Sequence, residues 1–215
     1  MKVLELFAGS CSFSNVAKQR GHKVFTSDWT EFEGIDYATD IMQFDINQLP
    51  FKPDVIWASP PCTTFSIASC GTHWTPDRQP KTKACEEGIE YVKKTMSLIR
   101  ELNPKYFMVE NPRGILRKLD LIDSNLLNTI WYCTYGDERA KPTDIWTNLK
   151  EWKPRPVCWN GNKGCHHAPA PRGSKTGTQG RGNAYERSKV PEQLCNEILQ
   201  TIENNYKEDT NAEFI

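Results

Sequence analysis

The stretch VLELFAGS at residues 3–10 runs from apolar side chains into a turn of small residues. A helical pattern over 13–18 and Gly21 follow it, so the sequence predicts a strand, a tight turn and a helix that ends at the glycine. Apolar runs at 23–26 and 54–58 predict two more strands. Short apolar strands that alternate with helices are typical of a doubly wound α/β fold, in which helices cover both faces of a mostly parallel sheet.

The rest of the chain continues this alternation and then loses it. Apolar residues recur at helical spacing over 89–102, and a strand is expected at 106–109. From 150 to 189 the periodicity disappears, and a helix resumes after Pro191. We therefore divide the chain into a core over 1–149, a small irregular insert over 150–181, a returning segment with a helix over 182–207 and a disordered tail over 208–215.

The composition is that of a folded protein. The 215 residues are 38% hydrophobic and 25% charged, which suits one sizeable core. No apolar run approaches the roughly 20 residues that cross a bilayer, and residues 1–15 lack the pattern of a signal peptide. The eight cysteines are too scattered for a disulfide framework. We expect reduced thiols, a cytoplasmic location, no membrane contact and a monomer.

The net charge of zero hides a division along the chain. Residues 139–189 hold 11 Lys and Arg against 3 Asp and Glu, whereas the remainder holds 16 against 24. A basic segment on an acidic body predicts a polyanionic partner for that segment. An ordinary solvated loop is the alternative.

Two residues at predicted strand ends suit a nucleotide-like ligand. Gly9 lies in the turn after the first strand, and Asp28 follows the second. Ligands of parallel sheets bind beyond the carboxyl ends of the strands, where a glycine lets the backbone approach and a carboxylate accepts hydrogen bonds from ribose. A tight turn with a helix N-cap explains the same residues equally well.

The stretch SPPCTTFS at 59–66 is more specific. Two prolines at the end of an apolar strand stiffen the turn, so Cys62 is presented at a strand tip. Most cysteines are buried small hydrophobes, and we interpret Cys133 and Cys195 in that way. Cys62 is the candidate nucleophile.

Taken together, these motifs resemble those of the cytosine-5 DNA methyltransferases. Leu6-Phe7-Ala8-Gly9 is similar to the family's cofactor motif, Pro60-Pro61-Cys62 to its nucleophile motif, Glu110-Asn111 to its acid motif and Gly182-Asn183-Ala184 to its C-terminal motif. The matches keep the family's order over nearly the whole chain. The resemblance implies a Rossmann-like methyltransferase fold, S-adenosyl-L-methionine as cofactor, and methyl transfer to carbon 5 of cytosine in double-stranded DNA.

The resemblance also implies catalytic roles. The Cys62 thiolate adds to carbon 6 of a flipped cytosine while Glu110 protonates or hydrogen-bonds ring nitrogen 3. A thiol of ordinary pKa, roughly 8.5, is mostly protonated at neutral pH, so a nearby cation or helix dipole has to help. Arg139, in the place of the family's arginine-bearing motif, is the third predicted catalytic residue, and Lys141 is a further candidate cation. A phosphate clamp or plain surface charge is the alternative role for both.

The remaining site residues are implied in the same way. The predicted cofactor residues are Phe7, Gly9, Ser10, Asp28, Trp29, Asp40, Ile41, Pro60 and Asn183. The predicted DNA contacts are Ser66, Lys141, Arg172, Lys175, Thr178, Gln179 and Arg181, whose side chains suit phosphates and base edges. Residues 66–83 are expected to form a mobile lid after the nucleophile, or else an ordered surface loop.

The family's target recognition domain has to be compressed here into residues 150–181, which fits a compact viral or phage-type enzyme such as those of restriction–modification systems. In this insert Cys158, Cys165, His166 and His167 could ligate zinc. No Cys-x-x-Cys pair is present, so we predict no resident metal and favour a DNA-contacting loop whose histidines face phosphates.

Three rival functions stay open on the sequence alone. The same chemistry could act on RNA, as it does in one branch of the family. A catalytically silent DNA-binding relative is disfavoured by the intact Cys62 and Glu110. A small-molecule-binding α/β protein with a structural Cys62 is disfavoured by the basic segment.

Overall fold

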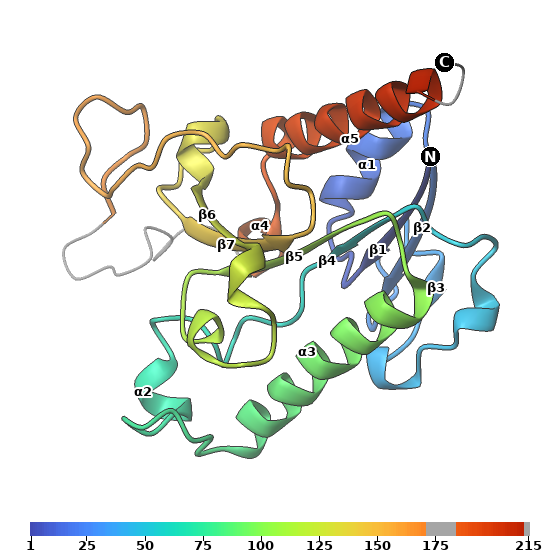
Figure 1. The fold of residues 1–215 in the computed structure, drawn as a ribbon. Coiled ribbons are helices and arrows are strands. Elements are labelled where there is room, and N and C mark those ends of the chain that lie inside the picture. The colour runs from blue at the N-terminus through green and yellow to red at the C-terminus, as the bar shows by residue number, and fades with distance from the viewer. Residues whose placement is uncertain (171–183, 213–215) are drawn as a thin grey trace.

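The computed structural model describes residues 1–170 and 184–212, and its centre is one seven-stranded sheet (Figure 1). The strand order is β3-β2-β1-β4-β5-β7-β6. The strands are β1 (Lys2–Leu6), β2 (Lys23–Asp28), β3 (Tyr37–Ala38), β4 (Val55–Ala58), β5 (Tyr106–Pro112), β6 (Leu127–Trp131) and β7 (Pro142–Thr147). The pairs among β1 to β5 are parallel, whereas β7 runs antiparallel to both β5 and β6. The predicted mostly parallel α/β sheet is confirmed.

Helices cover both faces of this sheet. The α-helices are α1 (Ser12–Gln19), α2 (Cys70–His73), α3 (Lys83–Leu102), α4 (Ala184–Ser188) and α5 (Glu192–Ala212). Short 3-10 helices are η1 (Ile41–Gln43), η2 (Ile46–Gln48), η3 (Leu116–Lys118), η4 (Ser124–Leu126) and η5 (Tyr132–Tyr135). In Figure 1 α1 and α5 lie together on one side of the sheet and α3 lies on the other.

Alternation along β1 creates two cores. Val3 belongs to the cluster that contains α1 and α5, and its neighbour Leu4 belongs to the cluster that contains α3. All four residues of β4 are buried, as expected for a central parallel strand covered on both sides. On the α1 side, Trp57 of β4 stacks on Phe13 with ring centroids 4.7 Å apart. The helices are therefore fixed to opposite faces by side chains one position apart.

The structure departs from the expected element boundaries in two places. Strand β5 continues past Val109 to Pro112, because Glu110, Asn111 and Pro112 pair with β7. Helix α5 continues to Ala212, past Lys207 where the sequence suggested a disordered tail. Within the described residues no helix is long and apolar enough to cross a membrane.

Candidate active site

The predicted site segments meet at the carboxyl edge of the sheet. Leu6 of β1 is in register with Ala58 of β4, and Ala58 is in register with Val109 of β5. The turn at 7–10, the turn at 59–62 and the side chain of Glu110 therefore begin at nearly the same level. Because parallel strands end together, the register alone brings these three segments to the same edge of the sheet.

The nucleophile turn at 59–62 and the residues after it are fixed to the end of β5 by one side-chain and one main-chain hydrogen bond. The Asn111 side chain donates from Nδ2 to the carbonyl oxygen of Pro60 at 2.9 Å, and the Ile115 N–H donates to the Phe65 carbonyl at 2.9 Å. At Gly114 the two backbone segments are so close that an added Cβ would lie 2.0 Å from the Phe65 carbonyl oxygen. Gly114 is therefore required for this approach, which sets the position of Cys62 relative to β5.

Glu110 is a buried acid with two polar partners. Glu110 is only 6% exposed. Its Oε1 accepts a hydrogen bond of 2.9 Å from the Tyr132 hydroxyl. The Lys141 ammonium lies 3.7 Å from the same oxygen and 4.6 Å from the centre of the Tyr132 ring. Tyr132 and Lys141 thus hold the carboxyl group from the side of β6 and β7.

Opposing effects act on the Cys62 thiol. Burial raises its pKa above the ordinary value, and the negative charge of Glu110 raises the pKa further. The positive charge of Lys141 is the largest influence that lowers the pKa, and Arg187 adds to it. Burial outweighs these cations, so the pKa of Cys62 stays raised, and Lys141 is the cation that opposes this effect most. The sequence named Lys141 for this role and also for DNA contact; a lysine that is 7% exposed and lies beside Glu110 suits the former.

Arg139 has a different set of partners. Its guanidinium forms an ion pair with Asp137 and donates to the carbonyl oxygens of Arg187 and Lys189 at 3.0 and 3.1 Å. It therefore fastens the returning segment at α4 to the end of β6 and β7. The catalytic role of Arg139 stays a prediction, and the contacts suit a positioning residue.

Two carboxylates hold the turn at residues 7–10 and the start of helix α1 that follows it. Asp28 accepts backbone N–H groups on both oxygens, from Gly9 at 2.9 Å and from Thr30 at 3.0 Å. Glu5 is 3% exposed and accepts the Ser14 N–H at 2.7 Å, and burial raises the pKa of Glu5 to about 7. Asp28 thus has the turn-organising role that the sequence left open.

Backbone geometry in this turn is unusual. Phe7 and Gly9 have φ of 56° and 45°, in the left-handed region. A non-glycine residue seldom adopts such a φ, and observed examples cluster at ligand-binding turns.

The other predicted cofactor residues differ in accessibility. The side chain of Trp29, directly after Asp28, is 80% exposed. Asp40 is exposed and caps η1 by accepting the Met42 N–H at 2.9 Å, whereas Ile41 is buried in the core beside α3. Ser10 Oγ lies 2.7 Å from Ser12 Oγ, and Pro60 is buried under the nucleophile turn. Asn183 lies outside the described residues.

Most of the predicted DNA contacts fall in the same undescribed stretch. Arg172, Lys175, Thr178, Gln179 and Arg181 lie outside the described residues. Ser66 is half-buried, and its Oγ lies 2.9 Å from Ser69 Oγ. The segment that starts there packs onto the core through Trp74, which is 3% exposed and donates to the Thr64 carbonyl at 2.8 Å. Residues 66–83 contain α2, and the mobile lid stays a prediction.

A Cys/His cluster forms beside the site, with a membership that the sequence did not predict. Cys158, Cys165 and His167 come together with Cys133, while His166 Nε2 lies 3.0 Å from the Asp137 carbonyl oxygen instead. The interpretation of Cys133 as a plain core thiol missed this, as did the inclusion of His166. Tyr132 was missed as well, because nothing in its sequence neighbourhood marks it as a partner of Glu110.

Comparisons with known proteins show the family of the chain. Residues 1–131, which include Cys62 and Glu110, match the model of the C-5 cytosine-specific DNA methylase family. A protein of Frog virus 3 (isolate Goorha), described as "Probable DNA (cytosine-5)-methyltransferase", is 31% identical over 162 residues, which is 72% of this chain and 74% of that protein.

A solved structure described as a DNA modification methyltransferase encoded within an E. coli prophage aligns with 74% of this chain and 52% of its own chain. Its sequence identity is 14% and its TM-score 0.49. The family match covers more than half of the chain, and the viral relative aligns with more than two thirds of it. The chain therefore belongs to the C-5 cytosine-specific DNA methylase family and is a DNA (cytosine-5)-methyltransferase.

Proposed function

We propose that this enzyme uses S-adenosyl-L-methionine to methylate carbon 5 of a flipped cytosine in double-stranded DNA, through a covalent bond between Cys62 and the base. The observation that carries the proposal is the grouping of Cys62, Glu110 and Lys141 at the ends of neighbouring strands, where charges of both signs act on the thiol. A thiol nucleophile with an acid held across the same crevice is the arrangement that addition to a pyrimidine ring requires.

The residues divide the reaction among them. Cys62 Sγ forms a bond to carbon 6 of the cytosine, and Glu110 keeps a proton at ring nitrogen 3 so that negative charge does not build up on the ring. Tyr132 orients the carboxyl group through its 2.9 Å hydrogen bond. Lys141 stabilises the thiolate before addition. Carbon 5, made nucleophilic by this addition, accepts the methyl group; its proton is then lost, the bond to Cys62 Sγ breaks and the ring becomes aromatic again.

The turn at the end of β1 suits the cofactor, which supplies an electrophilic methyl group when it is bound. The left-handed backbone at Phe7 and Gly9 opens the turn, Asp28 lies at its edge, and the exposed indole of Trp29 offers a flat apolar surface to a purine. We assign Asp28 to the ribose and Trp29 to the adenine.

DNA is assigned to the basic side of the molecule. Residues 139–189 carry the positive surplus, and the part of this segment that is described lies next to β6 and β7 (Figure 1). Lys141 directly precedes β7. A thiol and a methyl donor cannot reach opposite faces of a stacked base, so the cytosine has to leave the duplex. Phosphate contacts from this segment position the duplex, and they weaken with salt.

The test is methyl transfer to DNA by Cys62→Ala, with Cys70→Ala as the matched control because Cys70 is a half-buried thiol at the start of α2. Cys62→Ala should lose transfer and keep cofactor affinity by calorimetry, whereas Cys70→Ala should retain both. Wild type should also form a stable adduct on DNA that contains 5-fluorocytosine, because fluorine blocks release. Transfer by Cys62→Ala, or transfer by wild type without trapping, contradicts the covalent mechanism. Transfer to tRNA in preference to DNA contradicts the substrate.

A further inference from the structure

Four metal-ligating side chains meet at one point outside the catalytic crevice. The Sγ atoms of Cys133, Cys158 and Cys165 and a ring nitrogen of His167 all lie within 4.8 Å of one another. Cys133, Cys158 and His167 are buried and Cys165 is half-buried. Thiols and imidazoles are the preferred ligands of zinc, and closed sites with four such ligands are structural.

The distances fit a single tetrahedral ion. Four ligand atoms at about 2.3 Å from one zinc lie roughly 3.7 Å from each other. The Cys158 Sγ and His167 Nδ1 atoms are 3.8 Å apart. The wider limit of 4.8 Å for the whole group leaves a contraction of about 1 Å on binding, which rotation of side chains can supply.

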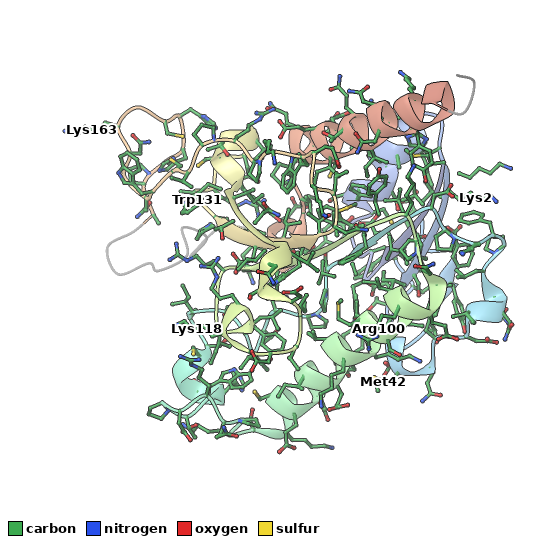
Figure 2. The ribbon with its side chains drawn as sticks, viewed as in Figure 1. Lys2, Met42, Arg100, Lys118, Trp131 and Lys163 are labelled. Carbon is green, nitrogen blue, oxygen red and sulfur yellow. The ribbon has the colours of Figure 1, made fainter. Side chains whose placement is uncertain are left out.

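The local fold gives this cluster a purpose. Residues 148–170 contain no helix or strand, and the apolar cluster around Cys133 and Cys158 adds only Ala140 as a buried member, apart from both main cores. Figure 2 shows Trp131 at the end of β6 and Lys163 at the outer end of the insert. Trp152 and Arg155 dock the start of the insert to α5. A core of this size cannot by itself hold the following residues 156–170 against their conformational entropy.

We propose that Cys133, Cys158, Cys165 and His167 bind one structural Zn²⁺ ion, which fastens the insert to the end of β6. One ligand comes from η5, directly after β6, and three come from the insert. The site begins just beyond residues 1–131, which match the family model. It is therefore an attachment specific to the second part of the chain, and it does not depend on the catalytic proposal.

Neighbouring contacts support the ligand set and predict one change. Asn162 Nδ2 lies 3.4 Å from Cys158 Sγ, where an N–H group stabilises a metal-bound thiolate. The Gly161 backbone nitrogen lies 3.3 Å from His167 Nε2. Once Nδ1 binds the metal, Nε2 carries the proton and can no longer accept the Gly161 N–H. This contact therefore has to open, and the Nε2–H group donates to another partner.

The position also links the metal to the acid. Cys133 directly follows Tyr132, which donates to Glu110, and His166 beside the ligand His167 contacts the carbonyl oxygen of Asp137. Loss of the metal should therefore loosen the insert first and disturb Tyr132 second.

The test is elemental analysis of tag-free protein. Wild type should carry about one equivalent of zinc per chain, and Cys133→Ser and His167→Ala should each lose it. The matched controls are His166→Ala, which removes the adjacent imidazole outside the cluster, and Cys70→Ser, which removes a thiol elsewhere; both should keep full zinc. Zinc that is retained by Cys133→Ser but lost from His166→Ala overturns this ligand set.

A second measurement uses wild type only, in case a ligand variant fails to fold. Chelation should lower the melting temperature and speed amide exchange in residues 150–165, and Co²⁺ added afterwards should give the absorption of a four-coordinate ion with thiolate ligands. Folded wild type that carries no zinc, takes up no Co²⁺ and melts unchanged after chelation overturns the proposal. A disulfide between any two of the three cysteines, in protein freshly purified in a reducing buffer, also overturns it.

Discussion

The carboxyl edge of the sheet and the described part of the insert, residues 150–170, are held in place by different kinds of contact. At the edge, β4 and β5 are in register, and main-chain hydrogen bonds such as Ile115 N to Phe65 O fix the nucleophile turn. The insert is docked by side chains, among them Arg155 and Trp152, which bind Glu197 of α5 at 2.8 and 3.1 Å. The edge should thus be sensitive to crowding of its backbone, and the insert to the loss of single side chains.

The largest effect is expected at the edge, from Gly114→Ala. The new Cβ would lie 2.0 Å from the Phe65 carbonyl oxygen, so the two chains have to separate and Cys62 moves relative to Glu110. A displacement of about 1 Å in a catalytic site costs on the order of a hundredfold in rate, so we expect at least that loss of kcat. Gly71→Ala is the control, because nothing lies within 4 Å of its Cβ position. Equal activity of the two variants would show that the edge is not set by this contact.

A second prediction separates the regions by pH. The pKa of Glu5 is raised from 4.5 to about 7 by burial. Its contribution to stability is therefore fully present below pH 4.5 and is lost as pH rises through 7. Glu5→Gln removes this dependence. Between pH 5 and pH 8 the free energy of unfolding of wild type should therefore fall by about 2 kcal/mol more than that of the variant.

Denaturant unfolding at both pH values measures this difference. Amide exchange should locate it at the turn after β1, while the insert exchanges alike in both proteins. A constant difference between variant and wild type across this range would mean that Glu5 is ionised when folded.

The third prediction sharpens the electrostatics of the edge. Glu110 raises the pKa of Cys62 and Lys141 lowers it. At neutral pH iodoacetamide should alkylate Cys62 faster in Glu110→Gln and more slowly in Lys141→Met. Each rate should change roughly tenfold for a Cys62 pKa change of one unit. Methyl transfer should fall in both. Because only the alkylation rates move in opposite directions, general misfolding cannot imitate this result. Rates that change in the same direction would remove Lys141 from its assigned role.

The smallest effect is expected from Arg155→Ala in the insert. This side chain binds Glu197 and also donates to the Thr134 carbonyl at 2.8 Å. Its partly exposed position limits the loss to about 1 kcal/mol of local stability. Hydrogen exchange should speed up in residues 150–165 and stay unchanged at the sheet edge. Arg100→Ala, at an exposed position of α3, is the control and should leave both regions alone.

The catalytic half was largely predictable from the sequence. Strands β1, β2, β4 and β5 and helices α1, α3 and α5 lie where periodicity placed them, within a few residues. Cys62 and Glu110 were predicted as site residues because strand ends carry site residues and because the motifs resemble a family; the structure places both at one edge of the sheet. Both signals are local, and parallel pairing converts them into a shared edge without further information.

The second part of the chain was less predictable. His166 and His167 are adjacent, and only the backbone path decides which imidazole turns inward and which reaches Asp137. Cys133 comes from another element, and Tyr132 and Lys141 meet Glu110 from β6 and β7. No periodic pattern encodes such meetings.

The sequence by itself thus determined the parallel sheet, the turn after β1 and the positions of Cys62 and Glu110 at strand ends, because each is encoded in residues close together in the chain. Only the tertiary structure decided that Lys141 is buried beside Glu110, that Asp28 braces the cofactor turn and that Cys133 completes the Cys/His cluster. The physical reason is that these contacts join side chains from separate elements, and their distances are fixed by how β7 turns back between β5 and β6 and how the insert folds onto that end.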